Sequence, residues 1–262
     1  IEEGAPWPDA ALHAKIAYLE KEGSQPGEAM SYLPITITAP CYRVWTSIRL
    51  QDTEQWIATW ADPHMYACLP GQGAVDAWYS LLLELELTDL QGVPYCGGTA
   101  DIQQFIDQIQ RNILYRTAKV GGMPSHILRA NASMAENLEA HNSIDGCIGR
   151  GHRGKCGIPQ GCPLSMMFVA LHVRPWLKEM EHLKVTAINL ADDVILIAKE
   201  EDMFTVFPKA LEITHKFLHN MGASVAPHKS SNFSRSNVGR EWLGKTTWRE
   251  IQAKTKVVDG IR

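Results

Sequence analysis

Two adjacent aspartates, Asp192 and Asp193, interrupt an apolar run of the sequence, "NLADDVILIA" at residues 189–198. Apolar residues flank the pair on both sides, as they would in a buried strand. Burying one ionised carboxylate is costly, and two neighbouring carboxylates repel each other. The pair therefore requires a positively charged partner.

A third carboxylate, Asp101, has a related setting. It follows "VPYCGGTA", which can form a short strand whose two glycines allow close backbone approach, and it precedes a helical pattern. Three carboxylates at the ends of two elements would be unstable without cations. Mg²⁺ favours carboxylates combined with substrate phosphates, and two metal ions support in-line phosphoryl displacement. We therefore predict that Asp101, Asp192 and Asp193 bind two Mg²⁺ ions, or Mn²⁺ in their place, for nucleotide addition.

Secondary structure must position these acids. A strand up to about Leu190 and a second strand over residues 194–198 predict a hairpin with both aspartates exposed at its bend. Asp101 falls at a strand-to-helix junction, where its side chain can point out of the sheet edge. Apolar residues over 102–120 mark one face of the following helix, which Gly121 and Gly122 close.

The rest of the chain alternates helical and extended patterns. Periodicity predicts helices at 7–22, 42–60 and 202–221, and another with Pro163 in its first turn. A short β-branched stretch lies within residues 23–40, and a turn and strand containing Lys229 lie within residues 222–234. Residues 150–155 form a basic, glycine-rich loop.

Composition sets the broad class. The chain has 262 residues, of which 45% are apolar, so it can bury a core as one large domain or two joined lobes. Its net charge of -4 gives no global sign of nucleic-acid binding, so such contacts depend on local basic patches. No apolar run approaches the roughly 20 residues that span a bilayer, which predicts a soluble protein. Because the sequence does not begin with methionine, we expect a piece of a longer protein.

The six cysteines show no CxxC pair and no regular spacing, which favours a reduced, intracellular setting over a disulfide scaffold. His152, Cys156 and Cys162 lie close together in the sequence, but no second ligand pair accompanies them. The pattern therefore favours scattered buried thiols over a zinc site.

Four motifs occur in a fixed order: "DIQQFID", "GIPQGCPLS", "LADD" and "GASVAPHKS". Together they resemble the palm motifs of reverse transcriptases, most closely the non-LTR (LINE-like) retrotransposon group. The upstream "YLPITITAPCYRVWTSIR" is similar to the segment that precedes the palm in that group. The ordered set is a much stronger signal than any acid pair alone.

The resemblance implies an α+β fold, the fingers and palm of a right-hand polymerase, with an antiparallel palm sheet backed by helices. Fingers would comprise residues 1–92 and 125–155. The palm would comprise residues 93–124 and 156–240, and residues 241–262 would begin the connection to a thumb. It also implies an RNA-directed DNA polymerase, whose partners are an RNA template, a DNA primer and deoxynucleoside triphosphates. Nuclear residence is implied in the same way.

The resemblance also assigns roles to single residues. Asp101, Asp192 and Asp193 would bind the metals, and Lys229 would neutralise or protonate the leaving pyrophosphate. Positively charged side chains would contact the nucleic-acid backbone, namely Arg150, Arg153 and Lys155. The nucleotide and template would contact Ile102, Phe105, Ile106, Gly157, Pro159, Gln160 and Gly161.

The sequence departs from the family pattern at four positions. Leu33 replaces an arginine expected to contact phosphate, and Gln104 replaces a lysine. Ile106 stands where an aromatic usually excludes a 2'-hydroxyl, so sugar selection is open. Leu190 replaces an aromatic two residues before the acid pair, which affects primer placement but removes no metal ligand.

Simpler interpretations of these residues remain open. The acid pair alone would more often be a solvated turn, and Asp101 a helix N-cap. Asp107, the second acid of "DIQQFID", is better interpreted as a helix-surface or structural residue than as a metal ligand. Two alternative functions also remain: an RNA-dependent RNA polymerase, and a catalytically inactive copy that only binds nucleic acid or a partner.

Overall fold

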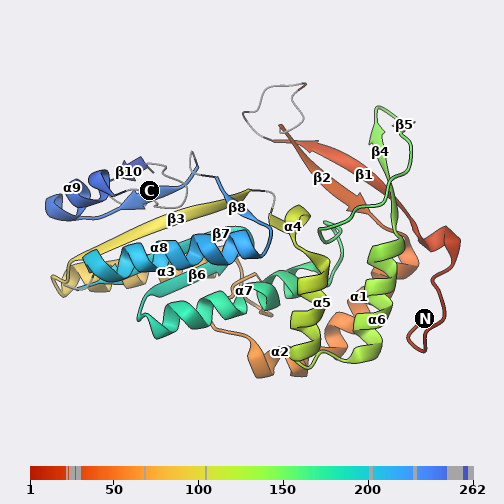
Figure 1. The fold of residues 1–262 in the computed structure, drawn as a ribbon, viewed down its shortest axis with the longest axis horizontal. Coiled ribbons are helices and arrows are strands. Elements are labelled where there is room, and N and C mark those ends of the chain that lie inside the picture. The colour runs from red at the N-terminus through yellow and green to blue at the C-terminus, as the bar shows by residue number, and fades with distance from the viewer. Residues whose placement is uncertain are drawn as a thin grey trace. The chain divides into compact units, whose positions relative to one another are not determined.

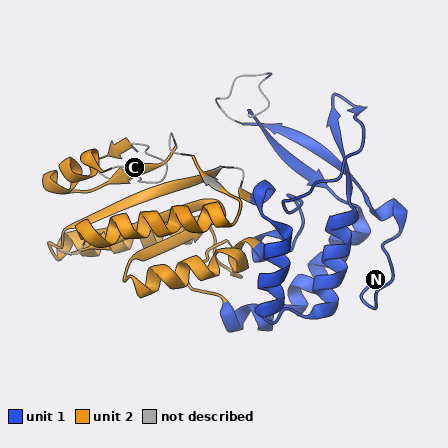
Figure 2. Ribbon diagram, in the orientation of Figure 1, with its two compact units in different colours: residues 1–60, 106–168 blue, residues 61–105, 169–262 orange. Residues whose placement is uncertain are grey.

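A computed structural model of the chain describes residues 1–21, 23, 27, 31–67, 69–103, 105–200, 203–226, 229–246 and 256–258 (Figure 1). The fold divides into two compact units (Figure 2). Unit 1 comprises residues 1–60 and 106–168, and unit 2 comprises residues 61–105 and 169–262. Residues 61–92, expected with the fingers, thus fall in unit 2. Residues 106–124 and 156–168, expected with the palm, fall in unit 1.

A four-stranded sheet forms one part of unit 1, in the order β2-β1-β4-β5. Its strands are β1 (His13–Glu20), β2 (Tyr32–Ile37), β4 (Glu139–Ile144) and β5 (Cys147–Ile148). The expected helix at 7–22 is therefore wrong: it is a single 3-10 turn, η1 (Asp9–Ala11), followed by β1. Because β1 pairs with β2 on one edge and β4 on the other, long-range hydrogen bonds override the local helical spacing.

Helices form the rest of unit 1. They are α1 (Pro40–Asp52), α2 (Glu54–Trp60), most of α4 (Phe105–Gln108), α5 (Arg111–Val120) and α6 (Ser125–Asn137). The expected β-branched strand and the helical stretch over 42–60 are confirmed. The prediction of one continuous helix over 102–120 is wrong, because the helix is interrupted between α4 and α5. The carbonyls of Ile106 and Ile109, which a continuous helix would use, accept instead from the backbone of Ile158 and Gly157.

Unit 2 contains a six-stranded sheet in the order β10-β9-β3-β7-β6, with β8 also paired to β3. Its strands are β3 (Tyr95–Gln103), β6 (Thr186–Leu190), β7 (Asp193–Lys199), β8 (Ser224–Val225), β9 (Ser231–Phe233) and β10 (Lys256–Val258). The pairs are antiparallel, except that β10 runs parallel to β9. The β6–β7 hairpin confirms the predicted turn, but only Asp192 lies in the bend, because Asp193 pairs with Leu190 and Asp101 as the first residue of β7. Lys229 lies between β8 and β9, not within a strand as expected.

Helices cover both faces of this sheet. They are α3 (Ala74–Leu90), α7 (Ser165–His182), α8 (Met203–Asn220) and α9 (Asn237–Lys245). α8 confirms the helix expected at 202–221. α7 begins at Ser165 and belongs to unit 2 from Val169 onward, so Pro163 lies in the turn before the helix and not in its first turn.

Two glycines of β3 allow the helices and strands to pack closely. A Cβ on Gly97 would lie 2.2 Å from the ring of Phe233, which belongs to the core formed with Leu81 and Leu85 of α3. A Cβ on Gly98 would lie 2.7 Å from Asn232 Oδ1 and 3.1 Å from the ring of Phe207 on α8. Because neighbouring residues of a strand face opposite sides, α3 and α8 cover opposite faces of the sheet.

Among the described cysteines, Cys96 and Cys162 are buried, whereas Cys41, Cys147 and Cys156 are exposed. All five are free thiols, as expected, but the expected burial is confirmed for only two of them. Within the described part of the chain, no helix is long and apolar enough to cross a membrane.

Candidate active site

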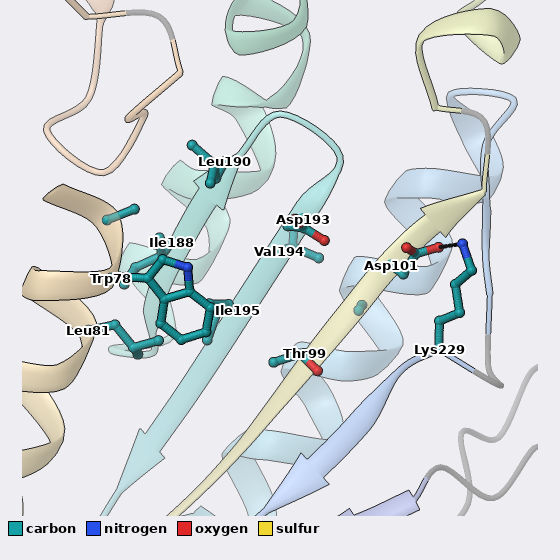
Figure 3. Close-up of a pocket in the computed structure, with 12 residues that line it drawn as sticks. Trp78, Leu81, Thr99, Asp101, Ile188, Leu190, Asp193, Val194, Ile195 and Lys229 are labelled. Atoms are coloured by element: carbon teal, nitrogen blue, oxygen red, sulfur yellow. Dashed lines mark ion pairs between the residues drawn. The ribbon is translucent and has the colours of Figure 1, made fainter. Parts of the chain in front are cut away.

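Asp101 of β3 and Asp193 of β7 are direct cross-strand partners in unit 2. Asp193 is the first residue of β7, and Asp101 lies close to the end of β3. Residues directly opposite each other in an antiparallel pair place their side chains on one face of the sheet. Both carboxylates line the same pocket, as Figure 3 shows. The structure therefore brings together acids that lie 92 residues apart in the sequence, since 193 - 101 = 92.

The bend that carries Asp192 is held by hydrogen bonds that the sequence did not reveal. Asn189, buried at the end of β6, donates from Nδ2 to the carbonyls of Ala191 (3.0 Å) and Asp193 (3.4 Å). The backbone N–H of Ile102 donates to the carbonyl of Asp192 at 3.3 Å. Asn189 thus stabilises the bend that carries Asp192, and its only signal in the sequence was a polar side chain near the end of an apolar strand.

Ala191 adopts a φ of 56°, in the left-handed region that L-residues with a Cβ rarely adopt. Such a conformation costs about 1–2 kcal/mol and persists where surrounding contacts impose it. Here the contacts are those of Asn189 and Ile102. The bend therefore carries strain beside the acid pair.

Electrostatics within this cluster are unfavourable for a bare carboxylate. Loss of hydration raises the pKa of Asp193, and the negative charges of Asp192 and Asp101 raise it further, whereas Lys229 lowers it. Lys229 Nζ lies 3.6 Å from Asp101 Oδ1 (Figure 3, dashed line). The Lys229 side chain is 56% exposed, so this ion pair is screened by solvent. One exposed lysine leaves the three negative charges incompletely balanced.

The donor set suits Mg²⁺. Carboxylate oxygens are hard ligands, and the raised pKa of Asp193 indicates that added positive charge would stabilise its ionised form. The carboxylate oxygens of the three aspartates do not all lie within 4.8 Å of one another. Among the described residues, the structure shows that spacing for a different group of side chains. Mg²⁺ does not require such convergence, because it usually takes one or two carboxylates together with waters and substrate phosphates.

An apolar wall adjoins the acids. The pocket has a volume of about 190 Å³ and combines Asp101, Asp193 and Lys229 with side chains of α3, β6 and β7. Figure 3 shows these apolar side chains on the other side of the pocket from the Asp101–Lys229 pair, namely Trp78, Leu81, Ile188, Leu190 and Ile195. A charged end beside an apolar wall suits a ligand that carries both phosphate and a flat, weakly polar ring.

The "GIPQG" loop belongs to unit 1, where it depends on both of its glycines. Gly157 has a φ of 81°, and a Cβ there would lie 2.7 Å from the carbonyl oxygen of Asp107. Gly161 has a φ of 109°, and its Cβ would lie 2.9 Å from the carbonyl oxygen of Thr36. Thr36 also donates from its backbone N–H to the carbonyl of Gln160 at 2.8 Å. The loop is therefore fixed against both α4 and β2.

Gln160 is held by Asp107. Its Nε2 lies 2.9 Å from each carboxylate oxygen of Asp107. Burial raises the pKa of Asp107, and the hydrogen bond from Gln160 opposes that rise. Asp107 thus takes the structural role expected for it, and it orients the glutamine of the motif.

Arg111, at the start of α5, is a buried residue that the sequence did not single out. Its guanidinium donates to the carbonyls of Gly157 (2.8 Å), Ala135 (2.9 Å) and Gly154 (2.9 Å). These contacts fix both ends of residues 154–157, which join the basic loop to the "GIPQG" motif. No spacing pattern in the sequence could have paired an arginine with three distant carbonyls.

The other expected site residues differ in accessibility. Arg150, Arg153 and Lys155 are exposed, as a surface that contacts nucleic acid requires. Ile102 and Phe105 are each 1% exposed and pack in the core of unit 2.

Ile106 and Pro159 are partly exposed in unit 1. Leu33 lies on β2 with an exposed fraction of 40%, and Gln104 lies outside the described residues. The acids and Lys229 thus gather in unit 2, and the "GIPQG" and basic loops in unit 1.

Solved structures share this fold. Apo telomerase from Candida tropicalis, truncated from its C-terminal domain, is similar with a TM-score of 0.64 and 15% identity, over 88% of this chain and 51% of that one. Telomerases from Candida tropicalis and Candida albicans, each in complex with a TWJ fragment of telomeric RNA, give TM-scores of 0.64 and 0.60 at 13% identity. They cover 89% and 87% of this chain and 42% and 43% of their own.

The chain therefore spans about half, or less, of these telomerase chains. At such low identity the likeness shows the fold, which is that of a right-hand polymerase. No curated protein matches the chain significantly. The family model for reverse transcriptase (RNA-dependent DNA polymerase) matches residues 21–247, which is most of the sequence. The chain belongs to the reverse transcriptase family.

Proposed function

We propose that this chain polymerises DNA on an RNA template by a two-metal mechanism. The observation that carries the proposal is the pairing of Asp101 with Asp193 across β3 and β7, with Asp192 at the adjoining bend and Lys229 beside Asp101. This arrangement occurs in a chain whose family is that of RNA-dependent DNA polymerases.

Each residue has a defined role in the proposed reaction. Asp101, Asp192 and Asp193 would hold two Mg²⁺ ions, which when bound would lower the pKa of the primer 3'-hydroxyl and stabilise the leaving oxygen. The primer 3'-oxygen attacks the α-phosphorus of a deoxynucleoside triphosphate, the bond to the β-phosphate breaks, and pyrophosphate leaves. Lys229 stabilises the negative charge of that pyrophosphate. The apolar wall around Trp78 lies against the sugar or base of the primer or nucleotide.

RNA is the proposed template. Two of the similar telomerase structures contain a fragment of telomeric RNA, which supports an RNA partner for the shared fold. In this chain, the exposed Arg150, Arg153 and Lys155 supply the positive charge for a phosphate backbone, and Gln160 contacts the template or incoming nucleotide. The order of the sequence motifs and the residues within them support the non-LTR retrotransposon group within the family. Membership of that group in turn supports residence in the nucleus.

Primer extension tests the proposal. The chain is supplied with a DNA primer on an RNA template, Mg²⁺ and labelled deoxynucleotides, beside Asp192→Ala and the matched surface variant Glu212→Gln. We expect extension by the parent and by Glu212→Gln, and a loss of at least about a thousandfold in Asp192→Ala, because a metal ligand is removed. A parallel reaction with ribonucleotides tests sugar selection at Ile106. Preference for ribonucleotides would favour an RNA polymerase.

Lack of extension is interpreted with a second measurement. Thermal unfolding with and without Mg²⁺ reports metal binding without requiring turnover. Stabilisation of the parent by Mg²⁺ that Asp192→Asn abolishes would support the metal site. Absence of both extension and Mg²⁺ stabilisation, in a folded protein that still binds RNA, would establish the binding-only alternative.

A further inference from the structure

A second cluster of metal-ligating side chains lies on the four-stranded sheet of unit 1, far in sequence from the acid motifs. β1 and β4 run parallel there, with His13 paired to Glu139 and Lys15 paired to His141 (Figure 1). In-register partners of neighbouring strands face the same side of a sheet, as do residues two apart in one strand. His13, Glu139 and His141 therefore share one face.

The donor atoms of these three residues converge. His13 Nδ1 lies 3.3 Å from His141 Nε2, and His141 Nε2 lies 3.7 Å from Glu139 Oε1. All three donor atoms lie within 4.8 Å of one another. Two nitrogens on a tetrahedral Zn²⁺ with bonds of about 2.0–2.1 Å would lie about 3.3–3.4 Å apart. The two imidazoles thus already have the separation that the ion requires.

A neighbouring carbonyl orients one of the ligands. His141 Nδ1 lies 3.3 Å from the carbonyl oxygen of Gly149. If Nδ1 carries the proton and donates it there, Nε2 presents its lone pair toward His13 and Glu139. Metal-bound histidines commonly donate their second ring nitrogen to a carbonyl in this way.

The glycine-rich loop makes room for the third ligand. A Cβ on Gly151 would lie 1.9 Å from Glu139 Oε1, so a larger residue would displace that carboxylate. Residue 152 holds the loop in place, because the backbones of His152 and Ala140 exchange two hydrogen bonds of 2.9 and 2.8 Å. Gly151 of the basic loop thus leaves the space that the Glu139 carboxylate occupies.

We propose that His13, Glu139 and His141 bind Zn²⁺ and so join β1 to β4. Two imidazole nitrogens and one carboxylate are typical Zn²⁺ ligands, whereas Mg²⁺ prefers oxygen ligands throughout. A water molecule completes the tetrahedron. The ion joins segments 128 residues apart and stabilises the sheet of unit 1. The proposal does not depend on polymerase activity.

Calorimetric titration of the metal-free chain with zinc chloride, in excess Mg²⁺, tests the site. We expect one Zn²⁺ to bind, and thermal unfolding to shift upward with it. His13→Ala, His141→Ala and Glu139→Gln should each weaken binding at least about tenfold. Lys15→Gln removes the positive charge in register with His141 but no ligand, and it should retain or strengthen binding.

Two further variants separate this site from other zinc ligands. Asp192→Asn alters the acid cluster, and the combined Cys41→Ser, Cys147→Ser and Cys156→Ser variant removes the thiols that are exposed among the described cysteines. Zinc binding should survive in both. Co²⁺ absorption gives a second readout of a tetrahedral site, and unfolding in chelator shows whether each variant folds. Absence of Zn²⁺ binding, or binding that persists without His13 and His141, would overturn the proposal.

Discussion

Asp101 and Asp193 are paired across β3 and β7, so that two negatively charged groups occupy neighbouring positions on the same face of a sheet. Like charges placed directly opposite each other destabilise a strand pair. Such a pair is retained where an ion or a charged substrate offsets the repulsion. This conflict between stability and function leads to the first prediction.

Asp193→Asn should stabilise the metal-free protein at pH 7. Burial and the charges of Asp192 and Asp101 raise the pKa of Asp193, so the folded chain holds this proton more tightly than the unfolded chain. The associated stability is present below the unfolded pKa of about 3.9 and is lost as pH rises through the folded value. Thermal unfolding without metal should therefore show a higher Tm for Asp193→Asn at pH 7, and little difference near pH 3.

Glu212→Gln, an exposed carboxylate of α8 in the same unit, provides the control and should change Tm little. Addition of Mg²⁺ should reverse the order of the two Tm values, because the parent has a carboxylate at residue 193 that can bind the ion and the variant does not. A lower Tm for Asp193→Asn in the absence of metal would contradict the interpretation.

Gln160→Leu should destabilise the fold through Asp107. The variant removes two hydrogen bonds of 2.9 Å to a half-buried carboxylate and raises its pKa further. Hydrogen bonds to charged groups contribute about 1.5–3 kcal/mol, so a loss of that order in the free energy of unfolding is expected at pH 7. Urea unfolding should show that the loss shrinks as pH falls and Asp107 takes up a proton.

A double-mutant cycle with Asp107→Asn separates this contact from general effects of Gln160. In the Asp107→Asn background, Gln160→Leu should cost clearly less than in the parent. Equal costs in the two backgrounds would show that Gln160 stabilises the loop by other contacts.

Gly97→Ala should disrupt the core of unit 2. The added methyl would lie 2.2 Å from the Phe233 ring, in a strand with partners on both sides. Overpacking of this kind costs about 1–3 kcal/mol, measurable by urea unfolding. Gly244→Ala, in α9 with nothing within 4 Å, is the matched control and should be neutral or stabilising. Partial recovery on adding Phe233→Leu would identify the ring as the cause, and a neutral Gly97→Ala would refute the packing argument.

His172→Leu should make the free energy of unfolding less dependent on pH in mildly acidic solution. His172 is fully buried, neither ring nitrogen has a hydrogen-bond partner among the described residues, and burial lowers its pKa to about 4. A lowered histidine pKa does not reduce the free energy of unfolding at pH values above the unfolded pKa of about 6.5. The loss of stability grows as pH falls from there toward 4. At pH 5 it is about 2 kcal/mol, since 1.5 pH units correspond to about that free energy.

The parent should therefore lose stability between pH 7 and pH 5 more steeply than His172→Leu. Urea unfolding at several pH values measures the slopes. His182→Gln, an exposed histidine of the same helix, is the control and should leave the parent's slope unchanged. Parallel slopes for parent and His172→Leu would show that water satisfies the buried ring.

The amino-acid sequence determined the family and much of the fold of unit 2. A continuous apolar run interrupted by an acid pair is sufficient to predict the β6–β7 hairpin, because short apolar runs and turn residues are local features of the sequence. The order of the four motifs predicted the family, which the family model confirms. Glycines at 97 and 98 predicted close backbone approach, although their partners could not be named.

Only the tertiary structure decided the rest. The segment at 13–20 has helical spacing but becomes a strand, because β2 and β4 supply hydrogen bonds on both of its edges. The helix after Asp101 breaks because backbone N–H groups of a loop about 50 residues further along the chain donate to the carbonyls of Ile106 and Ile109. Arg111 and the His13–Glu139–His141 cluster have the same cause. Each depends on contacts between segments far apart in the chain, which no local pattern of side chains encodes.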